Sequence, residues 1–217
     1  MDIHYNSSQI RRLDRFYRAN LINSIVGIKQ ANLVGTISNK KTSNLAIFSS
    51  AVHLGSNPSI IGIFSRPEIN KPKQTMNNII NRKHYTLNHV NASILRRSHA
   101  TSYKFDKDVS EFEKCNLAAK YIPNFKAPFV AEAEIGVGLE YLNDYKILEN
   151  GVVMIIGEIK HIRIRKTDLV QTNGEINLQS ARSIGVSGNN SYYDLMHRQT
   201  LDYIRSTEEL PPYLTSD

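Results

Sequence analysis

The sequence predicts a mainly β domain with flanking helices, in which short strands close into a barrel. Short segments rich in Ile, Val, Thr and Phe follow one another between Asn, Ser, Gly and Pro residues, as in all-β domains. Few stretches have helical periodicity, and the strand–helix alternation of a doubly wound sheet does not recur along the chain. The length of 217 residues suits one domain, so we expect residues 1–217 to form a single unit.

The first predicted element is an amphipathic helix over about residues 8–22. Apolar residues recur there at helical spacing, and arginines fill the other side. The apolar positions are Ile10, Leu13, Phe16, Tyr17 and Leu21. We expect Ser7 or Ser8 to cap this helix and its apolar side to dock on the domain. Binding of nucleic acid or membrane by the four arginines is the alternative.

Short strands and helices are predicted next. The strand candidates are residues 25–29, 31–38, 45–53, 59–65 and 84–91. A short helix interrupts them, because Met76, Ile79 and Ile80 share one helical face. Two further short helices are expected around residues 94–100 and 108–117.

Two long strands and a polar tail complete the chain. Residues 129–142 alternate between apolar and polar or glycine positions, which predicts a half-buried strand. In residues 151–166 the apolar parity switches, and a bulge near Lys160–His161 explains this. The tail, about residues 190–217, is expected to be polar and helical.

Composition and motifs exclude several classes of protein. The best apolar run, Val152–Ile156, is far too short for a membrane span, and the N-terminus lacks an apolar signal core. Cys115 is the one cysteine, so a disulfide within the chain is excluded and a reducing cytoplasm fits best. Gly136-Val137-Gly138 lies inside an alternating strand and is not a phosphate loop, and the seven histidines form no metal pattern.

The positive charge is local. Residues 61–107 contain nine basic and two acidic residues, which accounts for the net charge of +7. An excess of this kind indicates an anionic ligand or partner, or a solvated basic face.

Two segments could form an anion site. Residues 36–50 place Thr, Ser and Asn around a turn between strands, where backbone N–H groups are free. In residues 65–79, Thr75 stands at the start of the short helix, whose N-terminus suits phosphate, and Arg66 and Lys73 add charge. The alternatives are a polar hairpin turn, an ordinary N-cap at Thr75 and basic residues that face solvent.

At these segments the sequence resembles the flavin reductase-like family, which is related to flavoredoxin. The similar stretches are ANLVGTISNKKTSNLAIFSS, LGSNPSIIGIFSRP and KPKQTMNNIINRKHYTLNHVN, and further ones follow through SIGVSGNNSYYD. The resemblance implies a split β-barrel of Greek-key type that binds FMN. It also implies a homodimer with FMN near the subunit interface. One departure is that Lys40 and Lys41 fill a turn where relatives often have glycine.

The resemblance assigns site residues by position. Five residues would contact the ring and ribityl chain of FMN: Asn44, Leu45, Ala46, Ser49 and Ser50. Four would hold its phosphate: Ser65, Arg66, Lys73 and Thr75.

The expected function is an FMN-dependent oxidoreductase that takes electrons from NADH or NADPH and passes them to free flavin or another acceptor. No catalytic side chain is assigned, because the flavin performs the redox chemistry. The alternatives are an electron carrier without NAD(P)H activity, a pyridoxamine-phosphate oxidase of related fold, and a basic barrel that binds nucleic acid. The last would stack bases on aromatic residues such as Tyr85 and Tyr103.

Overall fold

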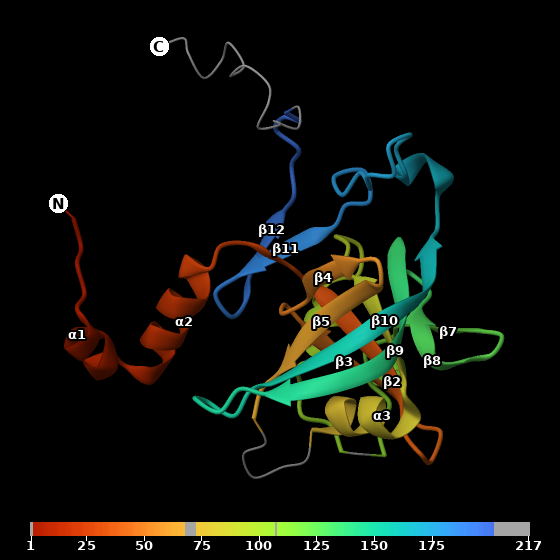
Figure 1. The fold of residues 1–217 in the computed structure, drawn as a ribbon, viewed down its shortest axis with the longest axis horizontal. Coiled ribbons are helices and arrows are strands. Elements are labelled where there is room, and N and C mark those ends of the chain that lie inside the picture. Colours follow the sequence, from red (N-terminus) through yellow and green to blue (C-terminus); the bar gives the residue numbers. More distant parts are fainter. Residues whose placement is uncertain (1, 68–72, 107, 202–217) are drawn as a thin grey trace.

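The computed structural model describes residues 2–67, 73–106 and 108–201, and a seven-stranded antiparallel sheet forms its centre (Figure 1). In sheet order the strands are β3 (Ser43–Phe48), β2 (Asn32–Ile37), β6 (His84–His89), β9 (Ile135–Lys146), β10 (Val153–Ile164), β5 (Ser59–Ser65) and β4 (Val52–Ser56). The expected closure by strand pairing is wrong for the described residues. Strands β3 and β4 are the two edges of the sheet and do not pair with each other, since β3 pairs with β2 and β4 pairs with β5.

Two smaller sheets flank the large one. One contains β1 (Lys29–Gln30), β11 (Ile184–Ser187) and β12 (Ser191–Asp194), and the other is the hairpin of β7 (Ala119–Ile122) and β8 (Phe125–Val130). The predicted helical tail is wrong over the described residues 190–201, because β12 pairs with β11 there. The rest of that tail, residues 202–217, lies outside the described residues.

The helices are short. They are α1 (Ser7–Arg12), α2 (Arg15–Ile25), α3 (Gln74–Arg82), α4 (Leu95–Ala100), α5 (Glu111–Lys114) and the 3-10 helix η1 (Thr167–Leu169). The predictions for α3 and α4 are confirmed, whereas the helix expected over 108–117 is reduced to α5. No helix among the described residues has the length and apolar character needed to cross a bilayer.

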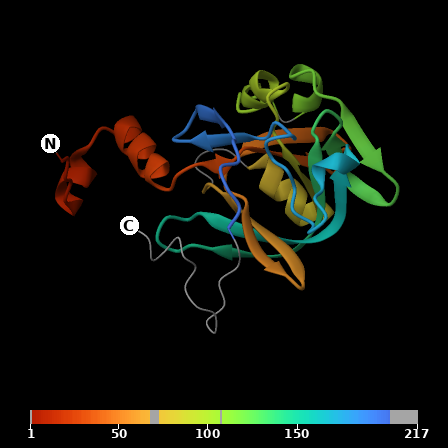
Figure 2. The same ribbon diagram turned by 90° about the horizontal axis from the view of Figure 1, so that it is seen from above.

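The predicted N-terminal helix is two helices. Asp14 begins the second one, because its carboxylate accepts the N–H groups of Phe16 and Tyr17 at 2.8 and 3.0 Å. Asn6, and not Ser7 or Ser8, caps the first. The expected docking is wrong, since neither helix has a buried residue and Phe16 is 71% exposed. Figures 1 and 2 show both helices projecting from the body of the molecule.

The strand predictions differ in outcome along the chain. Those for β2, β5 and β6 are confirmed, but the segment 45–53 is divided between β3 and β4. Helix α2 runs through Ile25, so the strand expected at 25–29 is limited to β1. The segment 129–142 is not one strand, because a turn at 131–134 separates β8 from β9. The bulge in β10 is confirmed between Ile159 and His161.

Two apolar clusters cover the opposite faces of β2 and β3. On one face Leu33 and Leu45 pack with Phe112 of α5, and on the other Val34 packs with Ile79 of α3. Strand β8 passes so close to β2 that a Cβ on Gly35 would collide with the carbonyl oxygen of Pro128. The large sheet is therefore covered on both sides at the edge that carries the predicted site.

Candidate functional site

Strand β3 and helix α3 bring the two predicted anion-binding segments together. The side-chain amide of Asn44 donates a hydrogen bond from Nδ2 to Oγ1 of Thr75 over 3.2 Å. Beside it, Nδ2 of Asn78 on α3 donates to Oγ1 of Thr36 on β2 over 3.1 Å. Thr36 is fully buried and Asn44 nearly so. These two bonds fix the start of α3 against the edge of the sheet.

The first turn of α3 lacks a side-chain cap. Lys73 is the N-cap residue, with φ −83° and ψ 92°, and its side chain makes no capping hydrogen bond. Thr75 is the second residue of the helix, so the alternative reading of Thr75 as an ordinary N-cap is wrong. The first N–H groups of a helix have no partners within it, and together with the helix dipole they favour an anion. This end of α3 therefore suits a phosphate group.

The connection between β3 and β4 is tied to the end of β5. The hydroxyl of Ser50 donates to the carbonyl oxygen of Phe64 at 3.0 Å and accepts the N–H of Phe64 at 3.2 Å. Ser65 follows directly and is buried, and its hydroxyl donates to the carbonyl oxygen of Arg66 at 3.4 Å. The side chain of Arg66 is exposed. Ser50 thus joins the predicted ring-binding and phosphate-binding segments through backbone groups.

The other predicted residues divide by burial. Leu45 is fully buried in the apolar cluster beside α5, so a ligand on the α3 side could reach only its backbone. Ala46, Ser49 and Lys73 are half-buried. Within segment 65–79, residues 68–72 lie outside the described residues. They include Lys71, one of the nine basic residues of 61–107.

Sequence reasoning missed Glu111. Its carboxylate accepts the backbone N–H of Leu45 at 2.9 Å, and only 7% of the residue is exposed. Burial raises the pKa of this carboxyl group, while the bond from Leu45 lowers it. In the sequence Glu111 stands among charged residues, so nothing there distinguishes it from a surface acid.

Histidine and cysteine chemistry receives no support in the described chain. It contains no group of three or more His, Cys, Asp or Glu side chains that could hold a metal ion. His84 stacks on Phe125 with ring centroids 4.5 Å apart, and burial, followed by Lys126, lowers its pKa. Cys115 is buried, and burial together with Glu111 raises its pKa, as expected for an unreactive thiol.

A basic hollow lies elsewhere on the molecule. It has a volume of about 560 Å³ between β7, β8 and β10, and Lys120, His161, Arg163 and Arg165 are among its lining residues. None of the predicted FMN ligands lines it. The guanidinium of Arg163 already donates to the carbonyl oxygens of Val130, Ala131 and Ala133 at 3.0 to 3.3 Å.

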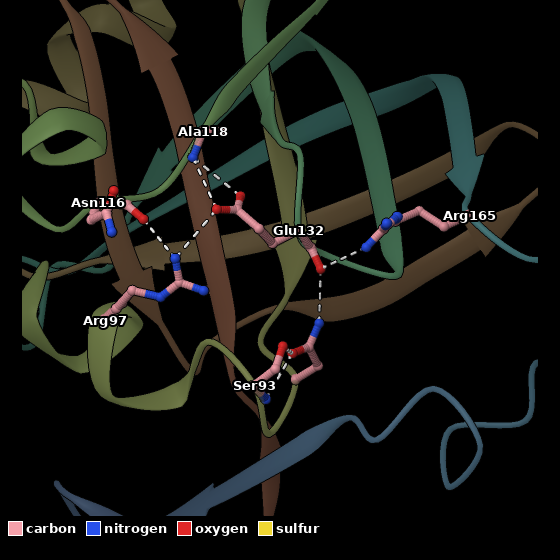
Figure 3. A network of polar contacts seen from close by, with 7 residues as sticks. Ser93, Arg97, Asn116, Ala118, Glu132 and Arg165 are labelled. Carbon is pink, nitrogen blue, oxygen red and sulfur yellow. Dashed lines mark hydrogen bonds and ion pairs between the residues drawn. The ribbon is translucent and has the colours of Figure 1, made fainter.

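A second polar network holds the turn between β8 and β9 (Figure 3). The carboxylate of Glu132 accepts the backbone N–H of Ala118 at 3.1 Å and a bond from Arg97 at 3.4 Å. The guanidinium of Arg97 also donates to the carbonyl oxygen of Asn116 at 2.6 Å. Glu132 and Arg97 thus bond to backbone groups and to each other, so we interpret this network as structural.

Burial also bears on the nucleic-acid alternative. Tyr85 is completely buried, with 0% exposure, inside the apolar cluster beneath α3. It therefore cannot stack on a base, and that part of the alternative is wrong. Tyr103 is 73% exposed.

Solved structures of other proteins share this fold. A split-barrel protein from Shewanella frigidimarina NCIMB 400, provisionally named a flavin reductase, is 38% identical with a TM-score of 0.89, over 94% of this chain and 100% of its own. Component B of nitrilotriacetate monooxygenase from Bacillus cereus has a TM-score of 0.82 at 16% identity, over 93% of this chain and 99% of its own. The expected split barrel is thereby confirmed as the fold.

Sequence comparison gives the family. A protein of Aquifex aeolicus (strain VF5) without a stated function is 27% identical over 150 residues, which cover 69% of this chain and 75% of the relative. The flavin reductase like domain family matches residues 29–177, from β1 past η1 and so across the whole large sheet. This chain belongs to the flavin reductase like domain family.

Proposed function

We propose that the chain binds FMN and acts as an oxidoreductase that takes electrons from NADH or NADPH and delivers them to free flavin or another acceptor. The observation that carries this proposal is the hydrogen bond between Asn44 and Thr75. It joins a polar strand edge to the N-terminus of α3, and a helix N-terminus beside polar side chains suits a flavin phosphate and its ribityl chain.

The described residues fit FMN by their chemistry. The N–H groups at the start of α3 and the hydroxyls of Thr75 and Ser65 would donate to the phosphate, and Arg66 and Lys73 would supply charge. Asn44, Ala46 and Ser49, with the backbone of Leu45 and the Ser50 connection, would line the ribityl chain and ring. Arg66 and Lys73, which belong to the basic segment 61–107, would then lie beside a dianionic group.

The cofactor and the residues that would bind it have different roles. Bound FMN supplies the redox chemistry, since its ring accepts a hydride and passes electrons on. The residues bind, orient and polarise, so we assign no proton transfer to any side chain. We also propose that the chain works as a homodimer in the cytoplasm, with the cofactor near the subunit interface.

The first test is the visible absorption spectrum of the purified protein, with and without added FMN. We expect a structured flavin spectrum that survives desalting. The Arg66→Ala/Thr75→Ala double variant should bind FMN about 100-fold more weakly, because two phosphate contacts are lost. Arg12→Ala, which removes an exposed arginine of α1, is the control and should bind as the wild type does. A protein that neither retains nor binds FMN contradicts the proposal.

Anaerobic addition of NADH and of NADPH separates the reductase from a carrier. Bleaching of the flavin spectrum at a rate that saturates with the nucleotide supports the reductase. If the holo-protein binds FMN but is not reduced by either nucleotide, it is the electron carrier instead.

A further inference from the structure

The outer edge of β3 is covered by residues 108–111. Nζ of Lys40 lies 3.3 Å from a carboxylate oxygen of Asp108, and the hydroxyls of Ser43 and Ser110 are 2.7 Å apart. The third link is the bond from the N–H of Leu45 to Glu111, at 2.9 Å. Three successive contacts therefore hold this segment along the strand.

The Glu111 bond is the buried member of this series. Side chains of the Lys40–Asp108 pair are 74% and 61% exposed, so solvent screens that contact. Glu111 is instead 7% exposed, on the short helix α5 whose Phe112 belongs to the apolar cluster, and the ion pairs found among the described residues do not include it. A charged acceptor in such surroundings makes a strong and directional bond to a backbone N–H.

The bond completes the fixation of β3. Through its inner edge β3 pairs with β2, where Asn44 lies opposite Thr36 and Ala46 opposite Val34. The N–H of Leu45 points to the other side, as alternate residues of an edge strand do, and would have no strand partner. Glu111 supplies that partner between the two residues proposed to face FMN.

We propose that Glu111 is a positioning residue of the FMN site, an inference that rests on the proposed function. Its carboxylate fixes the backbone at Leu45 and thereby the neighbouring Asn44, whose amide must meet Thr75 at the start of α3. A binding group that is loose by about 1 Å loses much of its contribution. Glu111 thus acts on the FMN site from the outer edge of the strand, without touching the ligand.

The experiment compares three full-chain variants. Glu111→Met keeps the volume but removes the acceptor, and an apolar side chain suits the cluster around it, so the variant should fold. Glu111→Gln retains an oxygen that can accept the Leu45 N–H. Glu132→Met is the control, because it removes in the same way a carboxylate that accepts a backbone N–H, that of Ala118, in the network of Figure 3.

Two quantities are measured: the dissociation constant for FMN, by quenching of flavin fluorescence, and hydrogen exchange at the Leu45 amide in the FMN-free protein. Glu111→Met should bind FMN at least about tenfold more weakly and exchange that amide faster. Glu111→Gln should stay within about threefold of the wild-type constant, and Glu132→Met should leave both quantities unchanged.

The outcomes separate the two proposals. A wild-type protein that does not bind FMN contradicts the proposed function. If the wild type binds FMN and a folded Glu111→Met variant binds it equally well, the positioning role is wrong. An equal loss in Glu111→Met and Glu132→Met also overturns it, because the effect would then be general destabilisation. Should Glu111→Met not fold, a tenfold loss in Glu111→Gln with unchanged thermal unfolding would equally contradict the role assigned to the acceptor.

Discussion

The two faces of β3 differ in chemistry although their residues alternate along one short strand. Toward α3 the strand presents Asn44, which bonds to Thr75, and Ala46. Toward α5 it presents Leu45, which is fully buried among apolar side chains. Because successive side chains point to opposite faces, one strand serves both the core and the site. The comparison teaches that stability and ligand binding can be separated here by substitutions at adjacent positions.

The largest effect is expected on the α5 face. Leu45→Ala should lower the free energy of unfolding by about 3 kcal/mol, because it removes a fully buried side chain and leaves a cavity. Urea denaturation followed by circular dichroism measures this change. A loss below about 1 kcal/mol would break the comparison, since it would mean that this face does not carry the core.

The next effect concerns His89, at the end of β6. Burial lowers the pKa of this histidine to about 4, and its Nδ1 lies 3.4 Å from the hydroxyl of Ser183. The folded pKa is below the unfolded value of about 6.5, so the unfolded chain binds the extra proton and stability falls as the pH drops from 6.5 toward 4. Over this range the free energy of unfolding should fall by about 2 kcal/mol. This is less than the full pKa shift implies, because part of the residue is exposed to water.

The measurement for His89 is urea unfolding at several pH values for the wild type and His89→Gln. We expect the variant to lack this part of the decline between pH 6.5 and 4. Curves that stay parallel over that range would show that His89 does not titrate as its burial implies.

A smaller effect is expected on the α3 face. Asn44→Ala should weaken FMN binding about tenfold, because the amide no longer bonds to Thr75 or reaches the ligand. Its free energy of unfolding should change by less than that of Leu45→Ala, about 1 kcal/mol. Fluorescence titration and urea denaturation on the same sample sharpen the comparison. A variant with unchanged FMN affinity and a large loss of stability would reverse it.

The smallest effect lies in the turn before β3. Lys41 has φ 65°, in the left-handed region that favours glycine, and its N–H donates to the carbonyl oxygen of Ser38 at 3.0 Å. Lys41→Gly should therefore raise the free energy of unfolding by up to about 1 kcal/mol without changing FMN affinity. Lys40→Gly, at the adjacent position without this conformation, is the control and should not stabilise the protein.

The sequence predicted those parts of the fold whose pattern is local. The strand predicted from the Ile- and Phe-rich segment 59–65, the helix predicted from the spacing of Met76, Ile79 and Ile80, and the bulge predicted from the parity switch near Lys160 are all present in the structure. The short strands β7, β11 and β12 were missed, because they are held by pairing with distant or adjoining segments and carry little periodicity of their own. The exposed apolar residues of α2 likewise misled the expectation of docking, since spacing alone does not say what covers a face.

For the site, residue types were easier to predict than their connections. Asn44 and Thr75 were both expected to be site residues, but the bond between them spans 31 residues and depends on how α3 packs on the sheet. Glu111 could not be found, because its role arises from an edge strand 66 residues away. Leu45 was assigned by position, and only the alternation of β3 shows that its side chain points to the core.

The bulge in β10 has a consequence for chain length. Lys160 is the extra residue, since Ile159 lies opposite Leu139 and His161 opposite Gly138. The bulge takes up this extra residue, so the residues after it stay opposite their partners on β9, and Arg163, opposite Gly136, reaches the carbonyl oxygens of Val130, Ala131 and Ala133. A chain one residue shorter at this point would pair with β9 without a bulge and keep every later side chain on its present face, whereas a deletion at any regular position of β10 would turn those side chains over.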